Sequence, residues 1–372
     1  LGGINLLVVF GTLLVLAAWI GVYRLCEGPP RVRIIVMLIG MVAQSTGWSV
    51  RPQLLSQAFF VLALLLVSQP RRHWLYPPLF LLWANVHAGV ASGALVLIAA
   101  AAAAIWRFRA QAWRWLAIGA ASALASLLNP LGWNIWLYAL GSVNSVARKF
   151  ITEWQPPRLN YPNSYPFLVL AALVLLVAWL GRRSWATHRD WTFVLCAGLL
   201  LLLGAQSLRH TAIFTLLATP LLSHPFRAVA AQPPVPPAIG WLNGLLPLGA
   251  LVGGIFLVAN AWSARPAPFA PELVAGVRAC QGTLFNTFDY GGELIWFVPE
   301  RPVFIDNRQD PYPDQLFIDA GLAEESGDYR ELFARYDIAC AMVPVGQKIY
   351  PALVGDGWAE IVRTDTLAVL RR

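Results

Sequence analysis

The sequence predicts a polytopic α-helical membrane bundle of about ten transmembrane helices, followed by a small α/β soluble domain. Two observations predict this fold class. Of 372 residues, 58% are hydrophobic and 12% are charged, whereas about 25% are charged in ordinary soluble domains. Residues 1–262 hold 17 Lys or Arg and three acids, but residues 263–372 hold 10 Lys or Arg and 16 acids. We therefore expect a helical bundle over 1–262 and an extracytoplasmic α/β domain over 263–372.

Ten hydrophobic runs mark the expected helices. About 20 apolar residues are needed to span the hydrocarbon core as a helix, and several runs are shorter than that. The sequence starts at Leu1 and is apolar almost at once, so we expect a bundle truncated at its N-terminus. The runs cover residues 4–23, 34–48, 53–68, 74–86, 88–106, 114–129, 165–181, 191–206, 208–222 and 241–262.

The basic residues of alternate loops predict the orientation of the bundle. Cytoplasmic loops of membrane proteins carry an excess of Lys and Arg. With ten helices, twelve basic residues fall in one set of loops and five in the other. The richer set is Arg24, Arg31, Arg33, Arg71, Arg72, Arg107, Arg109, Arg114, Arg182, Arg183, Arg189 and Arg227; the poorer is Arg51, Arg148, Lys149, Arg158 and Arg209. The C-terminal domain is then extracytoplasmic. Because the positive charge orients helices, we predict no nucleic-acid binding.

Polar residues in the membrane part gather at the expected extracytoplasmic ends of the helices. Polar groups at membrane depth are costly and usually mark function. Arginine offers phosphate two donors at once, so several arginines around one cavity suit a phosphate group. Each residue alone is equally explained by helix packing or by contact with the headgroup layer. The candidate catalytic residues are Glu153 and His87, and the candidate substrate-binding residues are Arg51, Gln53, Asn85, Gln155, Arg209 and His210.

The C-terminal domain alternates between strand-like and helix-like segments, which favours an α/β fold with a partly parallel sheet. We expect strands at 283–287, 302–306, 338–344 and 359–370, the last broken near Asp365, and helices at 269–279, 291–298 and 313–336. Cys280 and Cys340 both lie in this domain, and they can pair if it faces an oxidising compartment.

A second candidate site follows two of the expected strands in this domain. Ligands favour the carboxyl ends of strands in α/β sheets, although Asp and Gly also simply form turns. The site comprises Asp289, Asp306, Arg308 and Asp310. Arg308 occupies what would be a ligand position of a calcium loop, so we predict no such loop. No metal or nucleotide motif is present, which leaves a divalent metal and any cofactor undetermined.

Seven segments resemble a group of polytopic bacterial membrane proteins. That group is similar in architecture to the C-type glycosyltransferases, the superfamily of the dolichyl-phosphate-mannose protein mannosyltransferases. The segments cover residues 51–53, 83–89, 128–133, 150–156, 207–210, 285–296 and 303–308, in the same order.

The resemblance implies sugar transfer from a polyprenyl-phosphate-linked donor on the extracytoplasmic face of the bacterial inner membrane. In that superfamily an acid in the first extracytoplasmic loop activates the acceptor. That loop would lie upstream of Leu1, so we expect the catalytic acid to be missing from the sequence. Membrane lipids and the lipid-linked donor are the expected partners. The rival hypothesis is a non-catalytic transporter, flippase or assembly factor for envelope polysaccharide. A transporter should show inverted repeats and interrupted helices at the midplane, and neither is evident in the sequence.

We predict that reporters fused after Arg372 will place the C-terminus outside the cytoplasm, because of the excess of basic residues in the opposite loops. A reporter that works only outside the cytoplasm should be active at this position. A reporter that works only in the cytoplasm should be inactive, and its activity would overturn the topology.

Overall fold

The computed structural model describes residues 3–44, 47–48, 50–141, 152–228, 269–308 and 312–372. Internal contacts divide the chain into two compact units. The described residues of the helical unit lie within 3–228, and those of the C-terminal unit lie within 269–372. The expected boundary at residue 262, the hydrophobic run at 241–262 and Asp310 lie outside the described residues.

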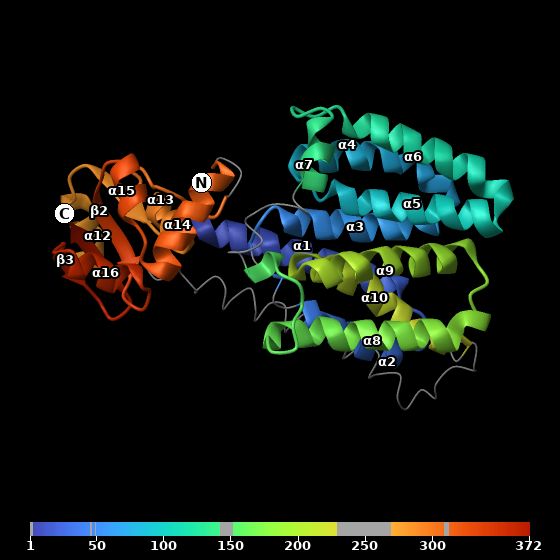
Figure 1. Cartoon of the computed structure of the whole chain (residues 1–372). Coiled ribbons are helices and arrows are strands. Elements are labelled where there is room, and N and C mark those ends of the chain that lie inside the picture. Colours follow the sequence, from blue (N-terminus) through green and yellow to red (C-terminus); the bar gives the residue numbers. More distant parts are fainter. Residues whose placement is uncertain (1–2, 45–46, 49, 142–151, 229–268, 309–311) are drawn as a thin grey trace. The chain divides into compact units, whose positions relative to one another are not determined.

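The helical unit is built from helices that lie side by side (Figure 1). Nine of the expected hydrophobic runs form helices, and an additional short helix follows residue 133. The helices are α1 (Gly3–Leu25), α2 (Pro30–Gln44), α3 (Gln53–Val67), α4 (Tyr76–Val86), α5 (Val90–Arg107), α6 (Ala112–Ser126), α7 (Asn134–Gly141), α8 (Tyr165–Leu180), α9 (His188–Gln206) and α10 (Thr211–Ser223).

The prediction of about ten membrane-spanning helices is not supported. Among the described residues, four helical segments are long and apolar enough to cross a membrane: Leu6–Leu25, Val90–Arg107, Pro162–Arg183 and His188–Gln206. The other helices from hydrophobic runs are 11 to 15 residues long. At 1.5 Å per residue such a helix extends only about 16–22 Å, less than the roughly 30 Å of hydrocarbon.

Small residues allow the helices of this unit to approach closely. Helix α4 packs on α6, α5 on α9, α2 on α10 and α1 on α3. A Cβ atom added to Gly93 would lie 2.6 Å from the ring of Trp83, which is fully buried. Gly89 and Gly93 have the four-residue spacing of small residues at helix-packing faces, and Gly93 of α5 packs in this way against Trp83 of α4.

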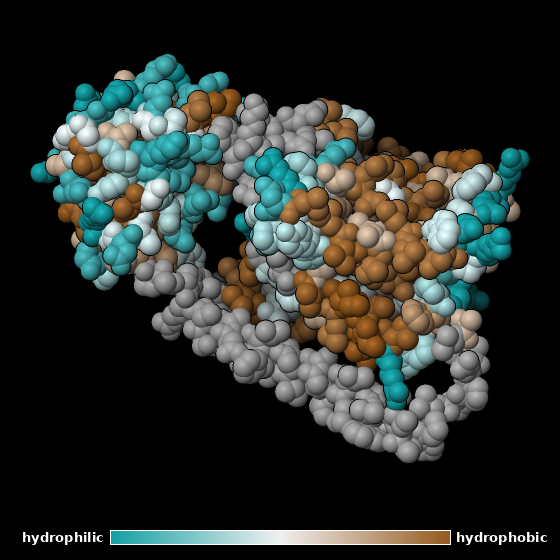
Figure 2. Space-filling model, turned by 60° about the horizontal axis from the view of Figure 1, so that its bottom comes forward, coloured by the Kyte–Doolittle hydropathy of each residue, from teal (hydrophilic) through white to brown (hydrophobic). Residues whose placement is uncertain are grey.

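The outer surface of the helical unit is largely apolar. Figure 2 shows hydrophobic residues spread over the described helices, whereas the C-terminal unit is mostly hydrophilic. Large side chains such as Leu13, Ile98, Leu124 and Trp179 are more than half exposed. Contiguous apolar surface of this extent is unusual for a soluble protein. The finding is compatible with a protein embedded in a membrane.

The C-terminal unit contains a four-stranded mixed sheet in the order β1-β2-β4-β3. Strand β1 pairs parallel with β2, whereas β4 pairs antiparallel with both β2 and β3, so the expected partly parallel sheet is confirmed. The strands are β1 (Thr283–Asn286), β2 (Ile338–Pro344), β3 (Ala359–Arg363) and β4 (Leu367–Arg371), and the helices are α12 (Pro271–Ala279), α13 (Gly291–Phe297), α14 (Asp314–Ser326), α15 (Arg330–Arg335) and α16 (Ile349–Gly355).

Two expectations for this unit are wrong. Residues 302–306 do not form a strand, because the buried Asn286 side chain bonds their backbone instead. Its Nδ2 group donates to the Ile305 carbonyl at 2.7 Å, and its Oδ1 atom accepts from the Phe304 N–H group at 2.8 Å. The expected helix at 313–336 is divided into α14 and α15, since Gly327 ends α14 with a φ of +80°, a conformation that glycine adopts readily.

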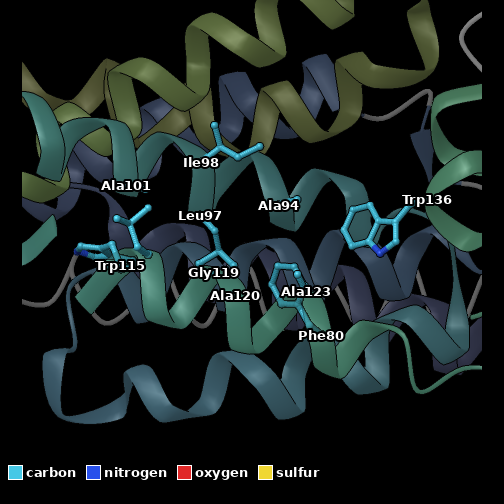
Figure 3. Close-up of a pocket in the computed structure, with 11 residues that line it drawn as sticks. Phe80, Ala94, Leu97, Ile98, Ala101, Trp115, Gly119, Ala120, Ala123 and Trp136 are labelled. Carbon is cyan, nitrogen blue, oxygen red and sulfur yellow. The ribbon is translucent and has the colours of Figure 1, made fainter. Parts of the chain in front are cut away.

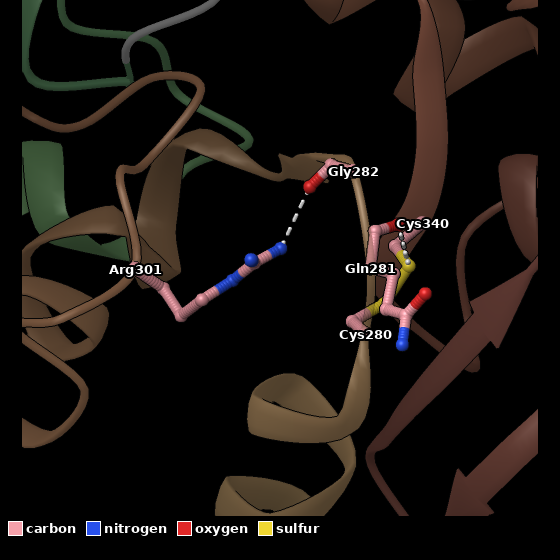
Figure 4. The surroundings of a disulfide bond; sticks show 5 residues. All are labelled: Cys280, Gln281, Gly282, Arg301 and Cys340. Atoms are coloured by element: carbon pink, nitrogen blue, oxygen red, sulfur yellow. Dashed lines mark hydrogen bonds between the residues drawn. A yellow bond between two sulfur atoms is a disulfide. The ribbon is translucent and has the colours of Figure 1, made fainter.

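A disulfide joins Cys280 and Cys340 across 60 residues (Figure 4). Cys280 directly follows α12, and Cys340 lies in β2. The bond thus ties the helix that begins the described part of this unit to the centre of its sheet. Arg301 also contacts this region, because its Nη2 group donates to the Gly282 carbonyl at 2.8 Å.

We predict that the double substitution Cys280→Ser, Cys340→Ser will destabilise the C-terminal unit by about 4 kcal/mol, the chain-entropy value for a loop of this length. Amide hydrogen exchange of β1 and β2 in the full chain should accelerate. The matched control is Cys26→Ser, Cys196→Ser, which removes two buried free thiols of the helical unit. Exchange in β1 and β2 should not change in that control. Equal exchange rates in the disulfide variant and the wild type would contradict the prediction.

Candidate functional site

One candidate ion pair joins the start of α3 to the segment that precedes α8. Arg51 lies two residues before α3, and its Nη1 group donates to both carboxylate oxygens of Glu153, at 3.0 and 3.2 Å. Both side chains remain about half exposed. Glu153 lies in the short 3₁₀ turn η6 (Thr152–Trp154). Two of the predicted site residues, 102 positions apart in the sequence, therefore meet.

Arg209 contacts Trp154, the next residue of the same turn. The Arg209 guanidinium carbon lies 4.1 Å from the centroid of the buried Trp154 ring, which is a cation–π contact. Two bonds join residues 153–155 to residues 207–208, at the start of the 3₁₀ turn η9 (Leu208–His210). Ser207 Oγ donates to the Glu153 carbonyl at 3.2 Å, and the Leu208 N–H group donates to the Gln155 carbonyl at 3.0 Å. Arg51 and Arg209 thus contact adjacent residues, Glu153 and Trp154.

His87 lies between α4 and α5 and contacts α3. Its Nδ1 atom is 2.8 Å from Ser56 Oγ and accepts from the Gly89 N–H group at 2.9 Å. Ser56 Oγ also accepts from the Nε1–H group of Trp83 at 2.8 Å. A Cβ atom on Gly89 would lie 2.6 Å from His87 Nδ1, so this close approach requires glycine. Ser56, Trp83 and Gly89 hold the ring, a role that sequence reasoning did not assign to them.

The first turns of α3 also join a buried amide network that sequence reasoning missed. Gln44, at the end of α2, accepts at Oε1 from the indole N–H groups of Trp19 and Trp48, at 2.9 and 3.0 Å. Its Nε2 group donates to Gln57 Oε1 at 3.3 Å and to the Ala212 carbonyl at 3.2 Å. Gln44 and Gln57 are 2% and 4% exposed. The sequence could have indicated this network, because a glutamine side chain inside an apolar helix must find hydrogen-bond partners within the protein.

The other predicted residues of the membrane part have separate positions. Asn85 is exposed, and its Nδ2 group donates to the Leu81 and Leu128 carbonyls, both at 2.8 Å. These bonds tie α4 to the end of α6. Asn85 therefore serves helix packing, which was the alternative to substrate binding. Gln53 begins α3, and His210 ends η9. The contacts between described residues do not connect Asn85 or His87 directly with Glu153.

An apolar cavity of about 340 Å³ lies elsewhere in the helical unit (Figure 3). Helices α4, α5, α6 and α7 supply its walls, with small residues such as Ala94, Ala101 and Gly119 between the larger Phe80, Trp115 and Trp136. None of the predicted site residues lines it. The described structure therefore gives no support for a cavity shared by His87, Glu153 and Arg209.

A charge network that sequence reasoning missed ties the other ends of α1, α9 and α10. Glu27 Oε1 accepts from Arg189 and from Arg227, both at 2.7 Å, and Oε2 lies 3.2 Å from His224 Nδ1. Arg227 also donates to Asp190 at 2.6 Å. Burial raises the pKa of Glu27, but the bonds from His224 and Arg227 and the charge of Arg189 outweigh it and hold the pKa at about 2.

Three groups of this network have the spacing of a metal site. Ligand atoms of Glu27, Asp190 and His224 lie within 4.8 Å of one another. The two carboxylates, however, already accept hydrogen bonds from Arg227, whose charge would repel a cation. This arrangement fits an ion-pair network that joins helices better than a metal centre. The sequence could have indicated this network, because Glu27 and Asp190 are two of only three acids in residues 1–262.

The second candidate site is partly assembled in the C-terminal unit. Asp306 is 1% exposed; it accepts two bonds from the Arg308 side chain at Oδ2, at 2.6 and 3.0 Å, and another from Tyr312 Oη at 2.7 Å. Burial raises the pKa of Asp306, but the Arg308 bonds outweigh it and leave the pKa lowered. A Cβ atom on Gly291 would overlap the Ile305 carbonyl. Asp306 and Arg308 therefore form a hydrogen-bonded ion pair with each other, which is the arrangement expected for a structural role.

Asp289 interacts electrostatically with a different carboxyl group, that of Glu324 in α14. Glu324 Oε1 accepts from the Phe288 N–H group at 3.2 Å, and Oε2 lies 3.5 Å from Gln347 Nε2. Burial first, and then the charge of Asp289, raise the pKa of Glu324 to about 7. Glu324 was missed, because nothing in the helical pattern around it distinguishes it from a surface glutamate.

Comparisons with known proteins do not identify a family. No protein-family model matches the chain, and no curated protein matches it.

We predict that Glu27 makes a pH-dependent contribution to the stability of the helical unit. The pKa is lowered from an ordinary value of 4.5 to about 2, so this contribution is complete above pH 4.5 and is lost as pH falls toward 2. The side chain is partly solvated, which reduces the expected value to about 1–2 kcal/mol. In detergent at pH 6, Glu27→Gln should lower the melting temperature, and the difference from wild type should shrink at pH 3.

The matched control is Glu325→Gln, which changes an exposed glutamate of the C-terminal unit. It should melt like the wild type at both pH values. A difference between Glu27→Gln and wild type that is the same at pH 6 and pH 3 would show that the carboxylate charge of Glu27 does not stabilise the unit.

Proposed function

We propose that the chain is a glycosyltransferase-like membrane protein that binds a polyprenyl-phosphate-linked sugar donor at the extracytoplasmic face. The observation that supports this proposal is that two arginines contact adjacent residues of one turn. Arg51 bonds Glu153, and Arg209 stacks on Trp154. Both guanidinium groups therefore contact residues of one turn. A phosphate presents the paired acceptors that arginine favours.

The proposal includes the orientation of the chain in the bacterial inner membrane. The twelve basic residues of the richer loop set favour a cytoplasmic location for the end that holds Glu27, Arg189 and Arg227. The opposite end, with Arg51, would then face outward. The Cys280–Cys340 disulfide supports an extracytoplasmic C-terminal unit, because disulfides persist in oxidising compartments. The short apolar helices would be held in the bilayer by packing against the four longer ones.

The alternative is a non-catalytic transporter, flippase or assembly factor for envelope polysaccharide. The observation that favours this alternative is the charged network that joins α1, α9 and α10 at one end, since such networks can break and re-form when helices move. Turnover separates the two hypotheses. A transferase releases polyprenyl phosphate from the sugar donor, whereas a flippase moves the intact donor between leaflets.

We predict that Arg209→Ala will weaken binding of a polyprenyl phosphate tenfold or more, because a hydrogen bond to a charged group contributes roughly 1.5–3 kcal/mol. Arg209→Lys should restore only part of the affinity, since lysine keeps the charge but loses the planar fork. Binding is measured in nanodiscs at fixed salt with the full chain.

The matched control is Arg158→Ala, which removes an exposed arginine from the same segment between η6 and α8. Its affinity should remain close to that of the wild type. An unchanged affinity in a folded Arg209→Ala protein would make Arg209 a headgroup anchor. Equal losses in the Arg158 and Arg209 variants would indicate general attraction of an anionic lipid.

A further inference from the structure

The apolar cavity of the helical unit is a groove that opens at the surface of the unit. Figure 3 shows Trp115 at one end of it and Trp136 at the other. Its wall on α6 extends from Trp115 to Ala123, which is about 12 Å along the helix axis. Ile98 and Leu116 both line the groove and are about half exposed. In a bilayer the groove is therefore accessible to lipid chains.

Small residues leave room along the groove. Ala94 of α5 and Gly119 and Ala123 of α6 are among the residues that line it. A Cβ atom added to Gly119 would meet no heavy atom within 4 Å, so Gly119, unlike Gly93, is not required for close helix packing. The lining contains no charged side chain. An aliphatic chain suits this space, whereas a sugar or a phosphate would lose its hydrogen bonds to water there.

Five arginines lie at the end of α4, α5 and α6 where the groove begins with Trp115. All five side chains are exposed. Arg114 donates to the Pro70 carbonyl, and the His73 and Trp115 rings have centroids 4.5 Å apart, so the connections before α4 and before α6 lie together. The arginines are Arg71 and Arg72 of the 3₁₀ turn η2 (Pro70–Leu75), Arg107 at the end of α5, Arg109 of the 3₁₀ turn η3 (Arg109–Gln111) and Arg114 in the first turn of α6.

No carboxylate of the described residues pairs with these five arginines. The sequence has no Asp or Glu between Glu27 and Glu153, and the ion pairs of the described residues include none of the five. Their printed partners are uncharged. The guanidinium carbon of Arg107 lies 4.6 Å from the centroid of the Trp191 ring, and Arg114 donates to a backbone carbonyl. This cluster of positive charge therefore attracts an anion from outside the chain.

Two exposed tryptophans indicate the depth of this end in a bilayer. Trp106 lies in the last turn of α5 and Trp113 in the first turn of α6, and they are 62% and 80% exposed. Tryptophan is enriched where membrane meets water, because its ring is apolar and its N–H group is polar. The arginines between and beside these rings are then at the level of the lipid headgroups, and the groove extends from them into the hydrocarbon.

We infer that this groove binds one anionic phospholipid of the surrounding bilayer. An acyl chain lies along α5 and α6, and the headgroup phosphate meets the arginines of residues 107–114, which offer it paired donors. Basic pockets between membrane helices are suited to anionic headgroups. A zwitterionic phospholipid has the same chains, but its own cation offsets the phosphate. The site lies at the other end of α3 from Arg51 and needs no sugar donor, so the inference goes beyond the proposed function.

The headgroup preference is tested by native mass spectrometry of the full chain with phosphatidylglycerol and phosphatidylcholine of identical acyl chains. The wild type should retain phosphatidylglycerol about tenfold better, because basic residues near the headgroups attract anionic lipid. Arg109→Gln, Arg114→Gln should remove most of this preference. The matched control, Arg182→Gln, Arg183→Gln, removes two exposed arginines of the turn that follows α8 and should keep it. Equal retention of both lipids by the wild type, or equal losses in the two variants, would overturn the inference.

The acyl-chain position is tested by filling the groove. Gly119→Leu places a side chain in the empty space and should lower retention of phosphatidylglycerol about fivefold or more, because apolar burial of the chain is lost. Gly198→Leu is the matched control: Gly198 lies in α9 outside the groove, and a Cβ atom there also meets nothing within 4 Å. Retention by a folded Gly119→Leu protein that equals the wild type would overturn the acyl-chain position.

Competition decides whether the occupant is a phospholipid or the lipid-linked donor. Excess polyprenyl phosphate should leave phosphatidylglycerol bound at this groove. Its displacement by polyprenyl phosphate in the wild type, with no displacement in Gly119→Leu, would assign the groove to the polyprenyl chain and overturn the phospholipid. The proposed function is tested separately at Arg209, so a loss of phosphatidylglycerol binding without a change in binding of the polyprenyl phosphate would leave it intact.

Discussion

The helical unit depends on one constraint, that an ion cannot be solvated by hydrocarbon. Charged side chains of its described helices lie at the two ends, and the contacts at each end follow from this. At one end, Glu27 and Asp190 share Arg227, so two carboxylates and their arginines offset one another. At the other end, Arg51 has a carboxylate partner and Arg209 has an aromatic one. Uncharged polar groups, such as Gln44 at the end of α2 and Gln57 in the first turns of α3, bond one another.

This difference between the two ends is the physical basis for assigning function to one of them. Paired, partly buried charges cross-link helices and leave little net charge for a ligand. At the other end, Arg51 and Arg209 contact the adjacent residues Glu153 and Trp154, and the Arg51 side chain remains about half exposed. The proposed donor-binding role therefore rests on two arginines that meet at one turn, since guanidinium groups offer paired donors to phosphate.

The sequence predicted helix positions well because apolar runs bounded by polar turns leave few alternatives in a bilayer. It predicted spans poorly, because runs shorter than the roughly 20 residues of a membrane span were counted as spans; α3 and α6 are 15 residues long. Strand 302–306 was mispredicted since a side chain, Asn286, took the place of a neighbouring strand. The pair of Arg51 and Glu153 could be anticipated from opposite charges at one end. Ser56 could not, because a serine in an apolar helix gives no sign of its partner.

The stacking of Arg209 on Trp154 has a consequence for the speed and the entropy of binding. An arginine side chain loses roughly 2 kcal/mol of rotamer freedom when it is fixed. Here the guanidinium carbon lies 4.1 Å from the centroid of the indole ring, so the buried Trp154 ring restricts the positions that the end of the Arg209 side chain can adopt. Part of the ordering occurs before a ligand arrives, so the arginine meets its ligand preorganised.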